Sequence, residues 1–233
     1  MFYYKKSGIK TFKMNQKLLF TENEGNAFFH RNKKYRNKID MSIDPIVLEL
    51  DYLFKINAIN FKNKKLKILE IGCGDGLRGS HIKKSIDCDY YGIDPSSDAV
   101  NFCNNNGLIA SVSTADKLLF KDNFFDIVIF GFCLYLCDRE DLNEISNEAS
   151  RVLNNKSWVI IMDFFSKHKS HNAYHHLEGV KSYKTDYRDI FDKTLYTCYS
   201  HKILDHKNYN FTETEDEWIS ISSLRKDDKL SLT

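Results

Sequence analysis

Two carboxylates and three glycines in the first half of the chain form a pattern suited to ligand binding. Glu70 is followed by Gly72, Gly74 and Gly76, with one residue between successive glycines. Glycine adopts positive φ without steric cost and lets a ligand approach the backbone closely. Eighteen residues after Gly76 stands Asp94. Because an acid at this position can accept hydrogen bonds from both ribose hydroxyls, the pattern indicates a nucleoside site.

Both acids stand near the ends of apolar runs, and such runs recur along the chain. Apolar patterning predicts strands over 66–71, 90–93, 108–112, 125–130 and 158–164. Helices are predicted over 46–61, 77–85, 99–105 and 141–153. Alternating strands and helices are typical of a mainly parallel sheet, which binds ligands at the carboxyl ends of its strands. Strands predicted over 194–204 and 218–224 are expected to pair antiparallel at the sheet edge.

The order of strand, GxGxG loop, helix, strand and acid resembles that of the class I S-adenosylmethionine (SAM)-dependent methyltransferases over residues 66–165. LEIGCGDG (69–76) resembles that family's first motif, and YYGIDPS (90–96) its second. Later segments that resemble the family are 113–120, 124–130, 148–153 and 158–161. The resemblance implies a Rossmann-like α/β fold. Its mainly parallel seven-stranded sheet would have an antiparallel C-terminal edge pair and helices on both faces. The resemblance also implies SAM as cofactor.

The resemblance further implies which residues bind each part of SAM. The methionine part would contact Glu70, Gly72, Cys73, Gly74 and Gly76. The ribose would be held by Asp94, flanked by Pro95 and Ser96, and the adenine by Thr114, Ala115 and Asp116. Phe130 and Gly131 would face the sulfonium. Glu70 would either fix the loop by hydrogen bonding or face the ligand's ammonium group.

Two positions depart from the family pattern. Many relatives carry an aspartate at the position of Thr114, so the contact to the adenine amino group is expected from Asp116 or from the backbone. Many relatives also carry a histidine after the fourth strand, whereas residues 131–136 contain none.

The outer parts of the chain carry a narrower resemblance. Residues 24–32 are similar to the N-terminal segment of methyltransferases from bacterial nucleotide-sugar and surface-polysaccharide pathways, with Asn26 replacing a frequent aspartate. Residues 173–176 and 182–187 fit the same group. The similarity implies a nucleotide sugar or polysaccharide precursor as acceptor, and we expect one domain over 1–233. Within it, 1–45 would form an N-terminal cap or lid and 165–193 a substrate-side insertion.

The aromatic side chains of this N-terminal segment have two possible roles. Phe28 and Phe29, together with Arg31 and Asn32, would cover SAM as a lid that excludes water. This lid would place Phe29 and Arg31 among the cofactor-binding residues. The alternative is a packed N-terminal helix without contact to the ligand.

Four side chains are candidates for catalysis on the acceptor side. His175 and His176 follow the fifth strand, and an unperturbed histidine titrates near neutral pH, so either can act as base for a hydroxyl acceptor. A carboxyl acceptor needs only orientation. Asp163 would orient the acceptor or be a solvated cap, and Tyr135 would contact the acceptor or pack. For the two histidines, the alternative is an exposed loop without function.

Composition excludes several other classes of protein. The net charge is +2 and the basic residues are dispersed, unlike the dense basic stripe of a duplex-binding protein, so nucleic acid is not an expected partner. No apolar run reaches the roughly 18 residues that span a bilayer, and the N-terminus lacks a signal-peptide pattern. The six cysteines form no CxxC pair and are expected to be reduced thiols of a cytoplasmic protein. A small-molecule acceptor is the expected partner, no metal is expected, and the oligomeric state stays open.

Two alternative functions use the same residues. An NAD-dependent oxidoreductase would bind its cofactor at the glycine loop and Asp94, although Leu77 occupies the place of the third glycine in GxGxxG. A non-catalytic SAM-binding scaffold would keep both features without turnover. Affinities for SAM and NAD distinguish the first alternative, and methyl transfer distinguishes the second.

Overall fold

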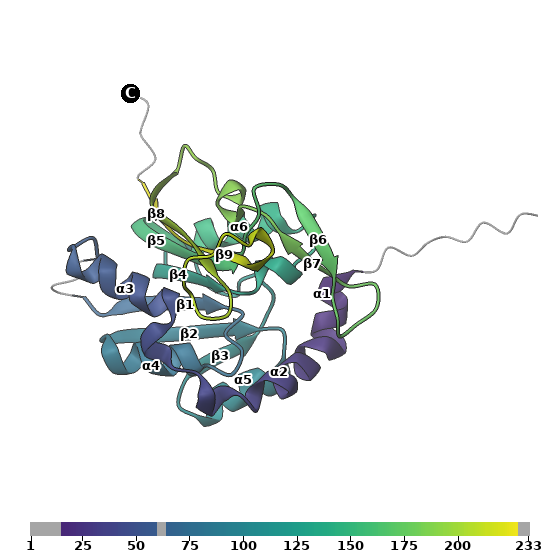
Figure 1. Cartoon of the computed structure of the whole chain (residues 1–233). Helices are drawn as coiled ribbons and strands as arrows, with labels where there is room; N and C mark the ends of the chain where they lie inside the picture. The colour runs from purple at the N-terminus through teal and green to yellow at the C-terminus, as the bar shows by residue number, and fades with distance from the viewer. Residues whose placement is uncertain (1–14, 60–63, 228–233) are drawn as a thin grey trace, which may run out of the picture.

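A seven-stranded sheet runs through the centre of the computed structural model, which describes residues 15–59 and 64–227 (Figure 1). The strand order is β3-β2-β1-β4-β5-β9-β8. The strands are β1 Leu66–Ile71, β2 Cys88–Asp94, β3 Ile109–Val112, β4 Phe125–Gly131, β5 Leu153–Phe164, β8 Tyr196–Asp205 and β9 Trp218–Lys226. Neighbours among β1 to β5 are parallel, β9 is antiparallel to β5, and β8 is antiparallel to β9. The predicted sheet, with its antiparallel C-terminal pair, is confirmed.

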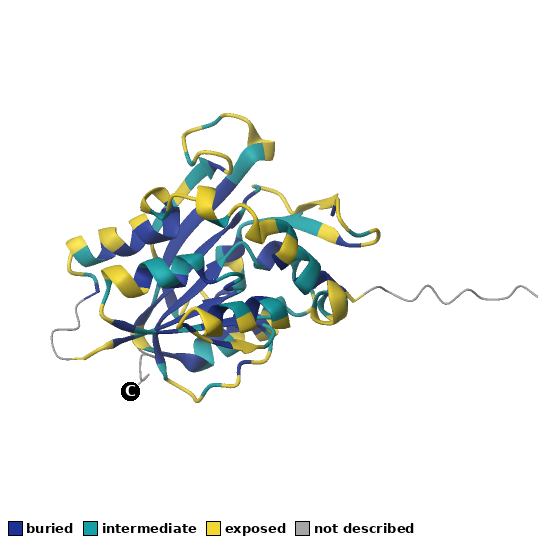
Figure 2. Cartoon of the chain, turned by 90° about the horizontal axis from the view of Figure 1, so that it is seen from below, coloured by how far each residue is buried: buried dark blue, intermediate teal, exposed yellow. Residues whose placement is uncertain are grey.

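Helices cover both faces of the sheet, as predicted. They are α1 Gln16–Leu19, a π-helix Phe20–Glu24, α2 Gly25–Lys33, α3 Pro45–Lys55, α4 Leu77–Ser85, α5 Ser97–Asn105 and α6 Leu142–Val152. Side chains of α3, α4 and α5 share one apolar cluster with Ile68, and α6 shares the other with Leu69, because successive strand residues point to opposite faces. Figure 2 shows the buried strands between helices whose outward sides are exposed. Within residues 15–59 and 64–227, no helix is long and apolar enough to cross a membrane.

The start of α3 follows directly from its sequence. Asp44 Oδ1 accepts hydrogen bonds from the amides of Ile46 and Val47 at 3.0 and 3.1 Å. Pro45 occupies the first turn, where its missing N–H costs nothing. Capping and the fixed φ of proline therefore place this helix start as predicted.

The end of α3 differs from the prediction. The helix stops at Lys55, six residues before the predicted end at Phe61, which lies outside the described residues. Asn57 has a φ of 57°, and the amide of Ala58 turns back to the Leu53 carbonyl at 2.9 Å. A residue in this left-handed conformation ends a helix. The apolar residues after Lys55 fit the helical spacing, which is why the helix was predicted to continue.

A second, two-stranded sheet lies between β5 and β8 in the chain. Its strands, β6 Ser170–Ala173 and β7 Lys181–Lys184, pair antiparallel. All four residues of β6 are exposed, so no alternation of polar and apolar residues revealed this strand. The small sheet falls within 165–193, whose substrate-side role stays a prediction. The cap role of 1–45 also stays a prediction, and residues 1–14 lie outside the described part.

Candidate functional site

The turn after β1 is shaped by its glycines. The amides of Gly72 and Cys73 donate to the Ile93 carbonyl at 2.8 and 3.0 Å. Gly72, Gly74 and Gly76 have φ values of 74°, 53° and 68°, which glycine adopts readily. A Cβ at Gly72 would lie 2.7 Å from a side chain of the loop after β4, whereas a Cβ at Gly74 would meet no atom within 4 Å. Gly74 therefore faces open space.

Asp94 lies next to this turn, with its carboxylate fixed by two backbone amides. The Gly74 amide donates to Oδ2 and the Ser96 amide to Oδ1, both at 2.9 Å. Burial raises the pKa of Asp94 to about 6, because the two amides offset only part of the loss of water. Each carboxylate oxygen has a further lone pair, so Asp94 can accept hydrogen bonds from a ligand as well.

A cavity opens at the carboxyl ends of β1, β2 and β4, with about 1030 Å³ of empty space that includes open solvent. One wall comes from the glycine loop and the ends of β1 and β2, another from residues 113–116, and a third from the segments after β4. The remaining side is formed by the N-terminal helical segment, which we define as residues 16–33. The residues that line the cavity are Lys17, Phe20, Gly25, Phe28, Ile71, Gly72, Gly74, Ile93, Asp94, Pro95, Ser113, Thr114, Ala115, Asp116, Gly131, Phe132, Cys133, Leu136, Cys137, Asp138, Asp141 and Ile145.

The cavity brings together many residues that the sequence predicted for SAM binding. Those that line it are Gly72, Gly74, Asp94, Pro95, Thr114, Ala115, Asp116 and Gly131. Phe28, predicted as part of a lid, lines it as well. Lys17 and Phe20 were not predicted, although they lie eleven and eight residues before Phe28 on the same helical segment. Such spacings place side chains on one face of a helix, and this pattern could have indicated that Lys17 and Phe20 face the same side as Phe28.

Three predicted cofactor residues of the central part support the cavity without lining it. A Cβ at Gly76 would lie 2.4 Å from Leu108, so Gly76 permits close packing of α4. Ser96 Oγ accepts from the Ala99 amide at 3.1 Å and caps α5. Cys73 is 7% exposed. Their direct contact with SAM stays a prediction, and the contacts seen here are supporting ones.

Three more predicted residues do not line the cavity, and their contact with SAM likewise stays a prediction. Phe29 packs against Phe102, with ring centroids 5.8 Å apart. Phe130 is fully buried in the core of the sheet. Arg31 forms an ion pair with Glu24. Side chains at these positions hold the walls of the cavity in place.

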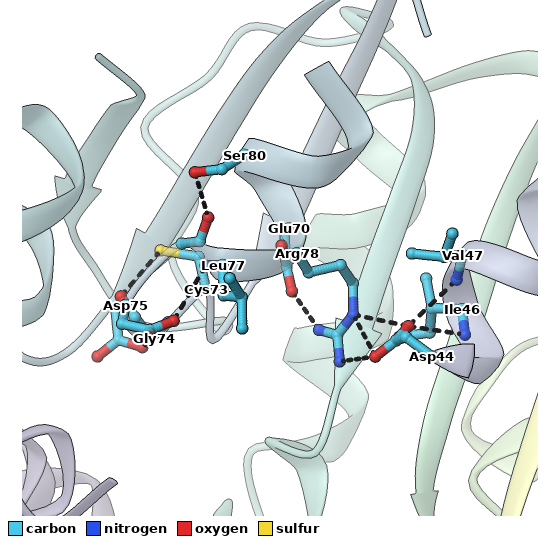
Figure 3. A network of polar contacts seen from close by, with 12 residues as sticks. Asp44, Ile46, Val47, Glu70, Cys73, Gly74, Asp75, Leu77, Arg78 and Ser80 are labelled. Carbon is cyan, nitrogen blue, oxygen red and sulfur yellow. Dashed lines mark hydrogen bonds and ion pairs between the residues drawn. The ribbon is translucent and has the colours of Figure 1, made fainter. Parts of the chain in front are cut away.

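Glu70 is buried in an ion network behind the cavity (Figure 3). Arg78 Nη1 donates to Glu70 Oε1 at 2.5 Å, and the Tyr90 hydroxyl donates to Oε2 at 2.6 Å. Arg78 Nη2 also donates to Asp44 Oδ2 at 3.0 Å. Burial raises the pKa of Glu70, and Arg78 and Tyr90 offset part of that effect. Of the two roles expected for Glu70, this geometry supports fixing the loop, and contact with an ammonium group stays a prediction.

Asp116 faces the cavity but is paired with a cation that is remote in sequence. Lys17 Nζ lies 2.7 Å from Asp116 Oδ2 and 2.8 Å from Asp141 Oδ2. Burial alone would raise the pKa of Asp116, but hydrogen bonds from Lys17 and Thr114 hold it below its ordinary value. Lys17 therefore already occupies the Asp116 carboxylate and would compete with adenine for this contact.

Asp163 is fully buried and serves the backbone. Its Oδ2 accepts from the amides of Leu134 and Tyr135 at 2.8 and 3.3 Å, and its Oδ1 from the Phe164 amide at 2.8 Å. Burial raises the pKa of Asp163 to about 7. Asp163 therefore caps the turn after β4, but it is buried and not solvated as the alternative expected. A role in orienting an acceptor stays a prediction.

Tyr135 and the two histidines do not line the cavity. The Tyr135 ring packs against Phe164 with centroids 5.0 Å apart, as in its packing alternative. His175 and His176 lie exposed in the connection between β6 and β7. A role as base stays a prediction that requires this connection to move toward the cavity. Among the residues described, no group of three or more histidine, cysteine, aspartate or glutamate side chains is placed to hold a metal ion.

Residues 69–161 match the family described as "Methyltransferase domain". Among curated proteins, O-methyltransferase 3 of Dictyostelium discoideum is 26% identical over 147 residues, covering 58% of this chain and 34% of the relative. A fatty-acid O-methyltransferase of Mycolicibacterium smegmatis is 31% identical over 102 residues, covering 42% of this chain and 36% of the relative. The chain thus spans about a third of the length of the curated relatives it matches.

Solved structures resemble this chain over most of its length. One is the 1,6-didemethyltoxoflavin-N1-methyltransferase of Burkholderia thailandensis with bound 1,6-didemethyltoxoflavin and S-adenosylhomocysteine, with a TM-score of 0.69, 11% identity and coverage of 92% of this chain and 91% of that one. Another is a SAM-dependent methyltransferase from Methanosarcina mazei, with a TM-score of 0.59, 16% identity and coverage of 76% and 98%. These similarities show the Rossmann-like class I fold that the sequence predicted.

Proposed function

We propose that this chain, which carries a methyltransferase domain with the Rossmann-like class I fold, is a SAM-dependent enzyme that methylates a small-molecule acceptor. One observation carries the proposal. Asp94, a carboxylate with spare acceptor capacity, faces the same cavity as the open side of Gly74. The names of the two curated relatives support oxygen as the methylated atom.

The residues that line the cavity fit SAM in both shape and charge. Asp94 offers a carboxylate to the two ribose hydroxyls, and Gly74 leaves room where any side chain would project. Lys17 is the sole cation among the described lining residues, which also include the acids Asp94, Asp116, Asp138 and Asp141. An excess of acids favours a ligand that carries a sulfonium and an ammonium group. A nucleotide phosphate would meet repulsion at the same place, which disfavours NAD.

Catalysis in this arrangement depends mainly on positioning. SAM, when bound, supplies a methyl group that is already electrophilic. The chain must hold an acceptor in line with the bond that breaks and must exclude water, and such positioning can provide a large part of a rate enhancement. Phe20, Phe28 and Phe132 supply apolar walls on the N-terminal and β4 sides of the cavity. Such apolar walls favour the exclusion of water around a bound ligand.

The identity of the acceptor stays a prediction. A small polar metabolite, including a nucleotide sugar or polysaccharide precursor, is expected from the narrower resemblance of the outer segments. Phe132 packs against Phe164, with centroids 5.4 Å apart, so an aromatic surface continues from the cavity along the end of β5. An acceptor with an apolar face would pack well on that surface.

Replacement of Gly74 by alanine is expected to reduce SAM affinity about tenfold or more while the fold persists. The added methyl group would project into the space that the ligand needs, since no protein atom lies within 4 Å of it. The left-handed backbone at this position costs alanine about 1 kcal/mol of stability. Equilibrium binding and thermal unfolding, measured on the same preparations, test both parts. Wild-type affinity in Gly74→Ala would mean that the ligand lies elsewhere.

Methyl transfer itself is tested with SAM labelled in its methyl group. Purified protein is incubated with labelled SAM and a cell extract of small metabolites, and the label is followed into extract compounds. We expect transfer that is reduced in Asp94→Ala when SAM is limiting. Intact SAM binding without transfer to any compound would contradict an enzymatic role and support the scaffold alternative.

A further inference from the structure

The N-terminal helical segment is joined to the opposite side of the cavity by one cation. Lys17 Nζ bridges Asp116 Oδ2 at 2.7 Å and Asp141 Oδ2 at 2.8 Å. Asp116 follows β3, and Asp141 directly precedes α6, so one side chain connects three separate parts of the chain. All three residues line the cavity. The bridge therefore lies at the cavity itself and not on a remote surface.

The residue before Lys17 strengthens this connection. Gln16 is 3% exposed, and its Nε2 donates to the carbonyls of Leu136 and Lys181 at 2.9 and 3.1 Å. Its Oε1 accepts from the Lys181 amide at 2.7 Å, so the Gln16 side chain pairs with the backbone of β7. Asp138 accepts from the amides of Gln16 and Lys17 at 3.2 and 2.9 Å. Gln16 and Lys17, which we call the latch, thus bind the loop after β4, β7, residue 116 and the start of α6.

The helical segment has further anchors beyond the latch. Asn26 Oδ1 accepts from Ser96 Oγ at 2.7 Å, directly after β2. Near the far end, Tyr174 donates to Glu24 Oε1 at 2.8 Å and accepts from Arg31 Nη2 at 3.0 Å. Residues 16–33 are therefore fixed in the middle and at the far end as well. Loss of the latch would free the part nearest Asp116 first and leave the rest attached.

We propose that Lys17 is a positioning residue that holds residues 16–24 closed over the Asp116 end of the cavity, so that the ligand of this cavity exchanges only when the bridge opens. The part that concerns exchange rests on the proposed function, with SAM as the ligand. The exposed fractions of the three side chains are 32%, 18% and 25%, which leaves the ion pairs accessible to water and salt. A bridge of this kind breaks readily enough to act as a gate and weakens as ionic strength rises.

Lys17→Met tests this proposal, because methionine keeps the apolar stem and removes the charge. Two quantities are measured: amide hydrogen exchange over residues 16–24 in the protein without ligand, and the dissociation rate of SAM. We expect both rates to rise about tenfold. Without the ion pairs, local opening of residues 16–24 requires less free energy, so the open state is populated more often. In the wild-type protein, high salt is expected to increase both in the same direction, and in Lys17→Met salt should have little further effect.

Three variants serve as controls. Lys17→Arg retains the charge and should restore slow exchange and slow dissociation. Lys33→Met removes a cation from the same segment that lies over the Phe102 ring at 4.4 Å, and should leave both rates unchanged. Asp141→Asn removes a single partner of the bridge and should give an intermediate effect if Lys17→Met proves poorly folded.

The outcomes separate the latch from the cofactor. Wild-type hydrogen exchange over 16–24 in both Lys17→Met and Asp141→Asn would overturn the proposed role of Lys17, whatever ligand the cavity takes. Faster hydrogen exchange in a protein that binds no SAM would support the latch and refute the proposed function. Faster hydrogen exchange with an unchanged SAM dissociation rate would overturn the gating step.

Discussion

Asp94→Ala is expected to weaken SAM binding by about 1–3 kcal/mol, which is roughly a five- to 150-fold rise in Kd. The variant removes the only carboxylate that is fixed by both the Gly74 and Ser96 amides beside the open side of the glycine loop. Calorimetric titration with SAM measures the effect. Asp98→Ala is the matched control, because Asp98 binds His30 on the surface and does not line the cavity. Equal affinities in the two variants would contradict the assignment of Asp94 to the ribose.

The same carboxylate gives SAM affinity a pH dependence. Burial raises the pKa of Asp94 to about 6, so this group is protonated in the free protein below that pH and then accepts hydrogen bonds poorly. We expect Kd to be constant above about pH 7 and to rise as pH falls through 6. The pH dependence at this position should disappear in Asp94→Ala.

Arg78→Met is expected to lower the free energy of unfolding by about 3–5 kcal/mol, because it leaves two buried carboxylates without their cation. Arg78 binds Asp44 Oδ2 at 3.0 Å and Glu70 Oε1 at 2.5 Å, and both acids are at most 3% exposed. Chemical denaturation measures the loss. Arg225→Met is the matched control, since Arg225 lies 3.9 Å from Asp227 in a partly exposed pair and should change stability by less than about 1 kcal/mol. A small loss in Arg78→Met, equal to that in the control, would refute the structural role of the network.

The loss of unfolding free energy in Arg78→Met should grow as pH rises. Burial already raises the pKa of Glu70 above its ordinary value of 4.5, and removal of Arg78 raises it further. In this variant the folded protein keeps a proton on Glu70 that the unfolded chain releases above about pH 4.5. The free energy of unfolding therefore falls as pH rises, and the difference from wild type should be larger at pH 8 than at pH 5.

The strands of the central sheet and the antiparallel pairing at its C-terminal edge were predictable because local patterns indicated them. β1 was predicted at 66–71 and forms over Leu66–Ile71, since a short apolar run bounded by glycine has few alternatives. The glycine loop and Asp94 were predictable for the same reason, because parallel strands bring their carboxyl ends to one edge. In contrast, all four residues of β6 are exposed, three of them polar, and this strand gave no periodic signal.

The parts of the site that the sequence did not reveal depend on contacts between remote residues. Lys17 meets Asp116 and Asp141 across 99 and 124 positions, and no local pattern indicates such a pairing. Glu70 was ambiguous because its direction depends on Arg78, eight residues later, and on whether that guanidinium is buried. Asp163 stood at a strand end like Asp94 but faces the amides of the next turn. The position of a carboxylate along its strand predicted that it lies at the carboxyl edge of the sheet. It did not predict whether the carboxylate binds a ligand or backbone amides.

The account is tested most directly by calorimetric titration of the purified protein with SAM and with NAD in parallel. We predict saturable one-to-one binding of SAM and no detectable heat with NAD, since the cavity presents an excess of acids around Asp94 and the glycine loop. A folded protein that binds neither SAM nor S-adenosylhomocysteine, or that binds NAD alone, would contradict the central claim.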